Sequence, residues 1–424
     1  MSDVLPEARL PAKQVFAVVA GNALEFYDFV TYAFFAAQIG RTFFPSGKPG
    51  ASLLASLATF GVGFLTRPLG ALIIGRYADR VGRKPAMLLS FWLMGIAMLG
   101  LPLVPSYAAI GVAAPILVIA FRLLQGFALG GEVGPNTAFL MEAAPPLRRG
   151  FYISLQAMSA DIAVMVAGIV GIALAAWLTP GALDAWGWRV ALLLGVVIIP
   201  FGLVIRRSLV ETLHRGPPAP APAAHRTPYT RIAMVSLALM ATATTTNYLL
   251  NYMTTYANST LGMAAQIAFG ATAVIGAAGV IFDPLGGWLS DRFGRRRVIL
   301  IPWLMLAAFI FPCFWLLEHF RTAPALYFAC AVLASTSTLA GTTALVAITE
   351  SLPRHVRAGG FGLIYALSIS VFGGSTQFMA AWLTQVFGSP LVPAWYMLGV
   401  LALGLSALVH LRETAPVKTG RIDS

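Results

Sequence analysis

Long apolar runs, each able to cross a lipid bilayer, recur along the whole chain. A membrane-spanning helix needs about 20 mostly apolar residues, and twelve such runs can be marked in the sequence. They cover residues 14–39, 51–75, 86–104, 110–140, 151–178, 188–206, 231–257, 266–289, 297–317, 324–348, 360–386 and 391–411. Lipid offers backbone N–H and C=O groups no partners, so the runs predict helices that satisfy their own hydrogen bonds. We therefore expect an all-α membrane protein with twelve transmembrane helices.

Composition agrees with a membrane protein and excludes a soluble globular one. Hydrophobic residues make up 58% of the chain and charged residues only 10%, whereas about 25% of residues are charged in an ordinary soluble domain. The net charge of +12 lies mainly in short loops between the apolar runs, so it does not indicate nucleic-acid binding. Cys313 and Cys330 lie inside apolar runs and the histidines are scattered, so we expect no disulfide, metal or cofactor.

Basic residues divide unevenly between the two sets of loops. If the chain crosses the membrane twelve times, 22 of the 28 Lys and Arg residues fall on one side and 4 on the other. The positive-inside rule then predicts that both termini are cytoplasmic, in the inner membrane of a bacterium. The first run has no small-residue cleavage site after it, so we expect a retained helix there and not a signal peptide.

Two loops carry the same motif. Residues 75–84 read GRYADRVGRK after the second run, and residues 287–296 read GWLSDRFGRR after the eighth. Both match the pattern G-x-x-x-D-R-x-G-R-[KR]. The repeat predicts two pseudo-symmetric six-helix bundles, residues 1–206 and 231–424, as in alternating-access transporters. Residues 207–230, which include a Pro-Ala run, are predicted to form a cytoplasmic linker between them.

The doubled motif resembles the signature of the major facilitator superfamily. Further segments resemble its metabolite–proton symporter branch, namely residues 21–29 (GNALEFYDF), 67–70 (RPLG), 122–127 (RLLQGF) and 186–189 (WGWR). Within that branch the chain is most similar to citrate and tricarballylate symporters, on residues 114–115 (AP), 150–156 (GFYISLQ) and 163–167 (AVMVA). The resemblance implies the two-bundle fold of that superfamily and transport of a small carboxylate with protons. One departure is Asp161, where a citrate carrier is expected to have an uncharged polar residue.

Acidic residues outnumber basic residues inside the apolar runs. The acids are Glu25, Asp28, Glu132, Asp161 and Asp283, and the bases are Arg67 and Arg122. Each ionised side chain near a helix centre costs about 2.5–3.5 kcal/mol on insertion scales. Since two bases cannot neutralise five acids, we expect some carboxyls to be protonated part of the time, because burial disfavours the charged form. A carboxyl that releases and regains a proton as its surroundings change is what proton coupling requires.

Helical spacing places polar residues of the first and fourth runs on one face of each helix. The set comprises Asn22, Glu25, Asp28, Tyr32, Arg122, Gln125 and Glu132. We predict Glu25 and Asp28 as the proton-carrying pair, with Arg122 as their switchable partner or as the substrate anchor, because its planar fork grips a carboxylate at two points. The alternative is an ion pair with Arg122 that only fixes helix packing. Glu132 is predicted either as a gate or second proton site, or as a contact to an adjacent helix.

The second half offers hydroxyl and amide side chains that suit substrate oxygens. The alternative role for such side chains is hydrogen bonding between helices. The predicted substrate-binding residues are Asn22, Tyr32, Arg122, Gln125, Gln156, Ser159, Thr245, Asn247, Tyr248, Asn251, Ser335, Thr338 and Ser368. Asp161 lies about 140° around its helix from Gln156, so we expect Asp161 to contact a neighbouring helix.

The two loop motifs predict a cytoplasmic gate. Each motif places an acid inside a basic run, so ion pairs there would close the inner face in one state and break in the other. The predicted gate residues are Arg67, Asp79, Arg80, Arg83, Asp291, Arg292 and Arg295. The alternative is a plain positive-inside anchor.

Three classes of function were weighed against these features. The first is import of citrate, tricarballylate, 2-oxoglutarate or a betaine-like osmolyte with protons, by a monomer. The second is proton-antiport efflux, which the helix count does not distinguish from import. The third is a membrane enzyme or receptor, for which the sequence offers no zinc motif, nucleophile elbow or phosphate loop. We therefore expect a transporter and not an enzyme, whose partners are protons, a small carboxylate and the lipid bilayer.

Overall fold

The computed structural model describes residues 12–48, 50–81, 83–130, 137, 140–141, 144–197, 229–352 and 357–420, and this part of the chain contains helices but no strand. The first half contains α1 (Ala12–Phe34), α2 (Ala36–Phe43), α3 (Ala51–Leu65), α4 (Arg67–Val81), α5 (Arg83–Leu103), α6 (Tyr107–Ile110), α7 (Ala113–Leu129), η1 (Pro146–Arg148), α9 (Arg149–Trp177), α10 (Pro180–Ala182), η2 (Leu183–Gly187) and α11 (Trp188–Val197). The second half contains α13 (Tyr229–Thr255), η3 (Tyr256–Thr260), α14 (Ala265–Phe293), α15 (Arg295–His319), α16 (Ala323–Ser351), α17 (Arg357–Ser368), η5 (Ile369–Gly373), α18 (Gly374–Phe387), α19 (Val392–His410) and α20 (Pro416–Thr419).

Each of the twelve apolar runs falls wholly or partly on described helix, which confirms the all-helical prediction. Eight of these helical stretches are long and apolar enough to cross a membrane by length and composition, and two others are shorter apolar helices. The predicted linker, residues 207–230, lies outside the described residues except for the start of α13. The boundaries of the two halves therefore stay a prediction.

The second span is broken between α3 and α4. Thr66 separates the two helices, and its Oγ1 donates a hydrogen bond to the carbonyl of Leu123 on α7 at 2.6 Å. A threonine hydroxyl that bonds to a neighbouring helix is typical of membrane bundles, where no water competes for it. The contact holds the start of α4, and therefore Arg67, next to α7.

Two apolar clusters fill the molecule, one in each half. Buried side chains between Tyr27 and Leu192 form most of one cluster, and buried side chains between Leu239 and Leu411 form most of the other. Tyr248, Phe269 and Ile369 of the second half pack into the cluster of the first half. The two halves are therefore separate bundles that meet along a shared apolar and aromatic surface.

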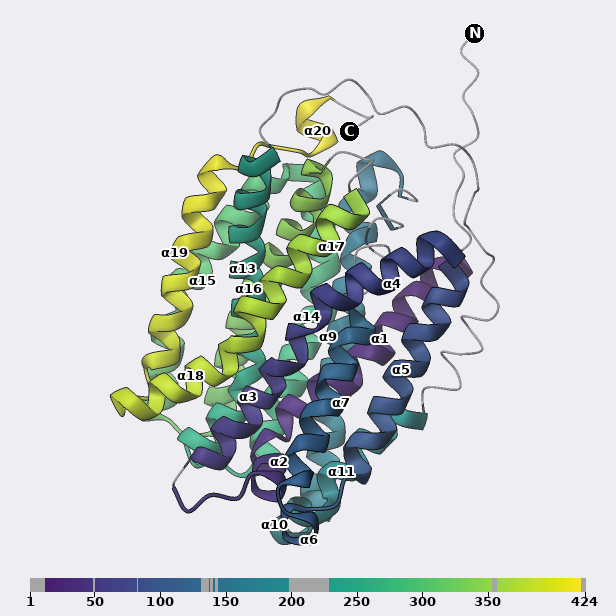
Figure 1. The fold of residues 1–424 in the computed structure, drawn as a ribbon. Coiled ribbons are helices and arrows are strands. Elements are labelled where there is room, and N and C mark those ends of the chain that lie inside the picture. The colour runs from purple at the N-terminus through teal and green to yellow at the C-terminus, as the bar shows by residue number, and fades with distance from the viewer. Residues whose placement is uncertain are drawn as a thin grey trace.

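The helices α9 and α14 lie side by side at the centre of the molecule and join the two halves (Figure 1). Glycines allow the close approach. A Cβ atom on Gly287 would meet the backbone of Gly150, one on Gly276 would meet the backbone of Met165, and one on Gly168 would meet the backbone of Ala273. Small residues let helix backbones approach in membrane bundles. We call this α9–α14 contact the seam.

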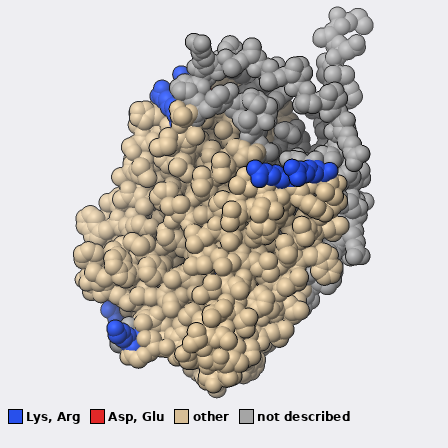
Figure 2. All heavy atoms as spheres, in the orientation of Figure 1, with Lys and Arg blue, Asp and Glu red and all other residues tan. Residues whose placement is uncertain are grey.

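Large apolar side chains cover the outside of the bundle. Trp92, Leu103, Trp177, Phe328 and Trp395 are each more than half exposed, with exposed fractions of 53%, 62%, 85%, 61% and 63%. Figure 2 shows that described Lys and Arg side chains on the face drawn lie toward the two ends, with a broad uncharged band between them. A soluble protein rarely exposes an apolar surface of this extent, so the band is the surface that lipid covers.

Candidate functional site

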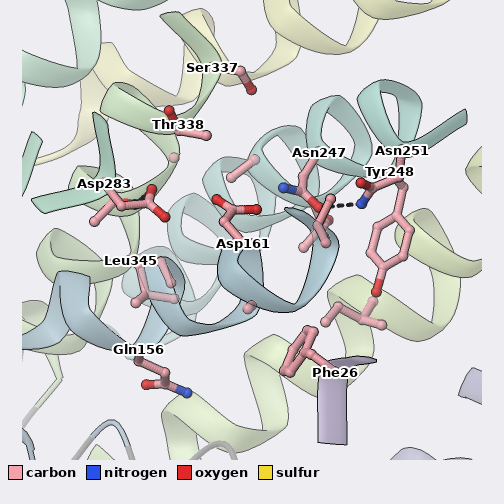
Figure 3. Close-up of a pocket in the computed structure, with 18 of the residues that line it drawn as sticks. Phe26, Gln156, Asp161, Asn247, Tyr248, Asn251, Asp283, Ser337, Thr338 and Leu345 are labelled. Atoms are coloured by element: carbon pink, nitrogen blue, oxygen red, sulfur yellow. Dashed lines mark hydrogen bonds between the residues drawn. The ribbon is translucent and has the colours of Figure 1, made fainter. Parts of the chain in front are cut away.

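A cavity of about 150 Å³ lies between the two halves (Figure 3). The first half contributes α1 and α9, and the second half contributes α13, α14, α16, α17 and η5. Polar and titratable lining side chains are Asn22, Gln156, Asp161, Thr244, Asn247, Tyr248, Asn251, Asp283, Ser337, Thr338, Thr342 and Tyr365. A mostly apolar concavity with a few convergent polar groups is typical of a small-molecule site.

Three of the predicted substrate residues of the first half form one hydrogen-bonded group. Asn22 Nδ2 donates to the Gln156 carbonyl at 3.1 Å and to Ser159 Oγ at 2.8 Å. Thr137 Oγ1, which sequence reasoning did not single out, donates to Gln156 Oε1 at 2.6 Å. Asn22 and Gln156 line the cavity and Ser159 does not, because its hydroxyl is fully buried behind Asn22.

Some of the predicted substrate-binding residues of the second half line the cavity, and others do not. Asn247, Tyr248, Asn251 and Thr338 line the cavity, and Asn251 Nδ2 donates to Asn247 Oδ1 at 3.1 Å (Figure 3). Thr245, Ser335 and Ser368 do not line it. Ser335 Oγ donates to the carbonyl of Ala331 in its own helix at 2.6 Å, as hydroxyls inside helices commonly do. The hydroxyl groups of Thr245 and Ser368 are buried and have no hydrogen-bond partner, so their predicted role in substrate binding stays a prediction.

Asp28 and Arg122 are joined through one amide. Gln125 Nε2 donates to Asp28 Oδ2 at 2.5 Å, and Arg122 Nη1 donates to Gln125 Oε1 at 2.7 Å. All three side chains are buried, with exposed fractions of 2% or less. Asp28 and Arg122 do not form a direct ion pair within the described residues, so Gln125 connects them. Arg122 Nε and Nη2 are buried and have no hydrogen-bond partner.

Aromatic rings surround Arg122. Its guanidinium carbon lies 4.4 Å from the ring centre of Phe29, 4.5 Å from that of Tyr32 and 5.1 Å from that of Phe60. Such contacts stabilise a cation in place of a counter-ion, more so when water is absent. Tyr32 and Arg122 therefore lie behind an aromatic layer, and neither lines the cavity.

Arg67 also lies in the aromatic layer, which corrects its predicted place in the cytoplasmic gate. The guanidinium carbon of Arg67 is 4.8 Å from the ring centre of Phe29 and 4.6 Å from that of Phe64, and the residue is 3% exposed. Its side chain also interacts with Tyr365. Arg67 follows Thr66 directly, at the start of α4, and helix periodicity alone could not reveal the interruption at Thr66.

The motif of the second half forms a network at the end of the bundle that carries α20. Arg295 Nη2 lies 2.8 Å from Glu350 Oε1 and its Nη1 lies 2.8 Å from Asp291 Oδ1. Asp291 also accepts hydrogen bonds from the backbone N–H groups of Gly150 and Phe151, which start α9 in the other half. The structure thus brings the predicted gate residues Asp291 and Arg295 of the second half together, and Asp291 connects them to the first half.

Other predicted gate residues lie elsewhere or outside the description. Arg292 does not join the network within the described residues, since its guanidinium lies over the rings of Trp288 and Phe293. Arg80 is exposed at the end of α4. The side chains of Glu25, Asp79 and Arg83, and residue Glu132, lie outside the described part. The sequence analysis did not single out Glu350, which pairs with Arg295 in this network.

Asp161 and Asp283 both line the cavity, with their carboxyl groups toward one another (Figure 3). Asp161 comes from α9 and Asp283 from α14, so the pair lies across the seam. The prediction that Asp161 contacts a neighbouring helix agrees with this position, because its side chain packs on Gly279 of α14. Helical spacing did not indicate that the same side chain also reaches the cavity.

Comparison with known proteins gives a consistent assignment along the whole chain. The profile of the Major Facilitator Superfamily matches residues 19–367. The citrate-proton symporter of Klebsiella pneumoniae is 36% identical over 418 residues, which cover 96% of this chain and 94% of that protein. The alpha-ketoglutarate permease of Escherichia coli K12 is 33% identical and covers 94% of both chains. The proline/betaine transporter of the same organism is 32% identical over 95% of this chain and 84% of its own length.

Solved structures share the fold. The xylose transporter XylE from E. coli, in a partially occluded inward-open conformation, superposes with a TM-score of 0.74 at 14% identity. The match covers 95% of this chain and 98% of that one.

Proposed function

The chain belongs to the major facilitator superfamily, and on that premise we propose that it imports a small di- or tricarboxylate of the citrate type together with protons, by alternating access. Inward movement of a negatively charged substrate against a membrane potential costs about 2.3 kcal/mol per unit charge per 100 mV. Protons that move with the substrate offset this cost. The named relatives are citrate, alpha-ketoglutarate and proline/betaine transporters, and two of these three transporters are named for carboxylates of more than one charge.

One observation carries the proposal: Arg122 is a fully buried cation with two unpartnered nitrogens. A buried N–H group without an acceptor costs about 1–3 kcal/mol, more when it is charged. A substrate carboxylate would supply acceptors for both Nε and Nη2, and a bidentate contact of this kind is the strong form of an arginine–carboxylate interaction. The Arg122 side chain is thus the best substrate anchor among the described residues.

Alternating access provides a route from the cavity to Arg122. The barrier consists of Phe60 and Phe64 from the first half and Tyr248 from the second, with ring centres 6.0 Å and 5.4 Å apart across the two halves. Tyr248 lines the cavity, and Arg122 lies on the other side of Phe60. Because these rings belong to different halves, separation of the halves opens the barrier and exposes the guanidinium to substrate.

Proton coupling follows from the chain of Asp28, Gln125 and Arg122. When Asp28 is ionised, its charge is transmitted through the Gln125 amide to Arg122 and competes with a substrate carboxylate for that cation. When Asp28 is protonated, the competition ends and Arg122 binds the substrate more tightly. Proton binding and substrate binding at two neighbouring sites then favour one another, as reciprocal linkage requires.

Orientation and assembly are part of the same proposal. The basic loops place the end of the bundle that carries α20 in the cytoplasm, with both termini on that side and residues 207–230 as the linker between two six-helix bundles. The transporter would act as a monomer in a bacterial inner membrane, because the cavity and the seam lie within one chain.

The experiment is uptake of radiolabelled citrate by purified full-length protein in proteoliposomes. Uptake should rise when the outside is made acidic and should be abolished by a protonophore. Arg122→Lys keeps the charge but not the planar fork, so we expect the KM for citrate to rise more than tenfold, for a loss above about 1.4 kcal/mol. Arg41→Lys is the matched control, because Arg41 pairs with Asp184 at an exposed position. Equal KM values for the two variants would refute the proposal. An uptake rate that does not change with the imposed proton gradient would also refute it.

A second candidate substrate is a betaine-type osmolyte. Within the described residues, two acids and no Lys, Arg or His line the cavity, which would suit a ligand with a permanent positive charge. Competition of glycine betaine and of 2-oxoglutarate against labelled citrate separates these substrates. Accumulation of a lipophilic cation outside the vesicles, driven by the gradient, would instead identify an efflux antiporter.

A further inference from the structure

We propose that Asp161 and Asp283 form a proton-sharing carboxyl pair across the seam, which holds one proton while α9 and α14 are in contact and releases it when they separate. This pair is a proton site in addition to Asp28, and the inference rests on the proposed function only for its role in transport.

Geometry brings the two carboxyl groups together. Asp161 and Asp283 line the same cavity, and their carboxyl groups point toward one another (Figure 3). Asp283 Oδ1 accepts a hydrogen bond from Thr342 Oγ1, while Asp283 Oδ2 is buried and accepts none from any N–H or O–H group. Two carboxylates in contact have no donor between them. A single bound proton supplies that donor and satisfies Oδ2.

Among the described residues that line the cavity, none is a Lys, Arg or His that could neutralise the pair. Seven elements line the cavity, namely α1, α9, α13, α14, α16, α17 and η5. Besides the two acids, the lining residues that face the pair include Asn22 and Phe26 of α1, Gln156 of α9, Asn247 and Tyr248 of α13, Ser337, Thr338 and Thr342 of α16, Tyr365 of α17 and Ile369 of η5. The titratable groups among the described lining residues are the two carboxyls and the phenols of Tyr248 and Tyr365. Arg67 and Arg122 lie in the aromatic layer beyond Tyr248. Like charges in contact cannot both ionise at low cost in such a site, so one proton stays with the pair.

The position of the pair couples its proton to conformation. Asp161 moves with the first half and Asp283 with the second, and the side chain of Asp161 fits against Gly279, one helical turn before Asp283. When the halves rock apart, each carboxyl loses the other as its hydrogen-bond partner and meets the water of the open cavity. Both groups then ionise, and the proton leaves on the side to which the cavity is open.

Infrared difference spectroscopy of the reconstituted full-length protein tests the pair without any substrate. The spectra are taken between acidic and alkaline buffer, and they report the C=O stretch of protonated carboxyl groups. Because the proton is shared, Asp161→Asn and Asp283→Asn should each shift the frequency of the same band, since an amide replaces one partner of the O–H···O contact. The double variant should lack that band. Asp184→Asn is the matched control, since Asp184 is an acid outside the cavity that pairs with exposed Arg41.

The single variants are expected to fold, because asparagine has nearly the shape of aspartate and its amide can form a hydrogen bond with the remaining carboxyl group, which still binds a proton in acidic buffer. Two independent bands, each removed by one variant and unchanged in the other, would overturn the inference. A band that survives in the double variant, or a spectrum that responds to sodium and not to pH, would also overturn it.

Transport provides a second readout for the same variants. Loss of one coupled proton should lower the final accumulation ratio of citrate about tenfold for each pH unit of imposed gradient, while exchange of labelled for unlabelled citrate continues. Unchanged accumulation in both single variants would contradict a coupled proton at the pair. If the wild-type protein carries no citrate at all, the proposed function fails, and the infrared result still decides whether the pair shares a proton.

Discussion

Asp291, near the end of α14, accepts a hydrogen bond from the backbone N–H of Gly150 in the first turn of α9 at 2.8 Å. The neighbouring N–H of Phe151 donates to the same carboxylate at 2.9 Å. The first N–H groups of a helix have no partner within the helix, and a negative charge stabilises that end. A carboxylate from one half therefore caps a helix of the other half. This closure uses backbone groups of α9, so a search for oppositely charged side chains would not find it.

Removal of this cap should open the seam more often. We expect Asp291→Ala to weaken the closed state by about 1 kcal/mol, the usual contribution of a cap, which is a shift of roughly fivefold in the equilibrium. Ser154 is fully buried in the first turns of α9, where it faces Gly287 across the seam, so Ser154→Cys reports opening. Maleimide labelling of Cys at this position should be about fivefold faster when Asp291→Ala is also present.

The maleimide labelling experiment needs two controls. Asp184→Ala in the Ser154→Cys background removes an acid that does not touch the seam, and it should leave the labelling rate unchanged. The chain without Ser154→Cys reports background labelling of Cys313 and Cys330, both of which are buried. Equal labelling rates with and without Asp291 would show that the cap does not hold the seam closed.

Much of the fold could be predicted because lipid imposes a simple rule. A run of about 20 apolar residues has one way to satisfy its backbone in a bilayer, so the positions of the helices followed from hydropathy. The repeated loop motif likewise indicated two halves. The break at Thr66 escaped prediction, because it depends on a hydroxyl that finds a carbonyl on α7, and that contact exists only after the helices pack.

Asp28→Asn should separate proton coupling from substrate binding. The amide oxygen of asparagine can still accept from Gln125 Nε2, so the contact to Arg122 is kept while the titrating group is lost. We expect exchange of labelled for unlabelled citrate to continue within about threefold of the wild-type rate. The rise of uptake at acidic outside pH should weaken, and the final accumulation ratio should fall about tenfold for each pH unit of imposed gradient, because one coupled proton is lost. Proteoliposome assays with and without an imposed gradient measure both. Gradient-driven accumulation at the wild-type level in Asp28→Asn would show that the proton is carried elsewhere.

Stability of the second half should depend on one buried ion pair. Arg295 Nε lies 3.0 Å from Glu350 Oε2 and Nη2 lies 2.8 Å from Oε1, and neither side chain is exposed. Removal of one member of such a pair leaves a buried charge without its partner and costs about 3–5 kcal/mol. We therefore expect Glu350→Ala to lower the melting temperature strongly, as measured in detergent by the reaction of the buried Cys313 and Cys330 with a thiol-reactive dye.

Glu413→Ala is the matched control for this prediction. Glu413 accepts hydrogen bonds from the backbone N–H groups of Arg295 and Arg296 at the start of α15, at 2.8 Å and 3.1 Å. Loss of such a cap costs about 1 kcal/mol, so this variant should melt only slightly below the wild type. Similar melting of the two variants would show that Glu350 contributes no more than a helix cap.

The composition of the candidate site was harder to predict than the fold. Helical spacing placed Asn247 and Asn251 on one face of α13, and both line the cavity together with Asn22 of α1 and Gln156 of α9. It could not show that Arg122 lies behind aromatic rings, since that depends on which faces of α1, α3 and α7 meet. It also could not pair Asp161 with Asp283, because these acids belong to different halves and no spacing relates them.

Gly279 should tolerate no side chain, because it receives the carboxyl group of Asp161. A Cβ atom at this position would overlap Cβ, Cγ and Oδ2 of Asp161. Gly279→Ala must therefore displace Asp161 from Asp283 or push α9 and α14 apart, and overpacking of this kind costs about 1–3 kcal/mol. We expect a lower melting temperature in the thiol assay and a final accumulation ratio of citrate that is about tenfold lower for each pH unit of imposed gradient. Gly399→Ala is the control, since a Cβ at Gly399 meets nothing within 4 Å. Replacement of a helical glycine by alanine there should stabilise the protein by about 0.5–1 kcal/mol.

A second substitution at Asp161 distinguishes two effects of Gly279→Ala, overpacking of the seam and loss of the acid pair. Asp161→Ala removes Cγ and the carboxyl oxygens, so the double variant Gly279→Ala/Asp161→Ala should recover most of the lost stability. It should not recover the wild-type accumulation ratio, because the second carboxyl remains absent. If Gly279→Ala alone is as stable and as active as Gly399→Ala, the close fit of Asp161 on α14 has no role in transport. If the double variant regains full accumulation, the steric contact matters and the carboxyl of Asp161 does not.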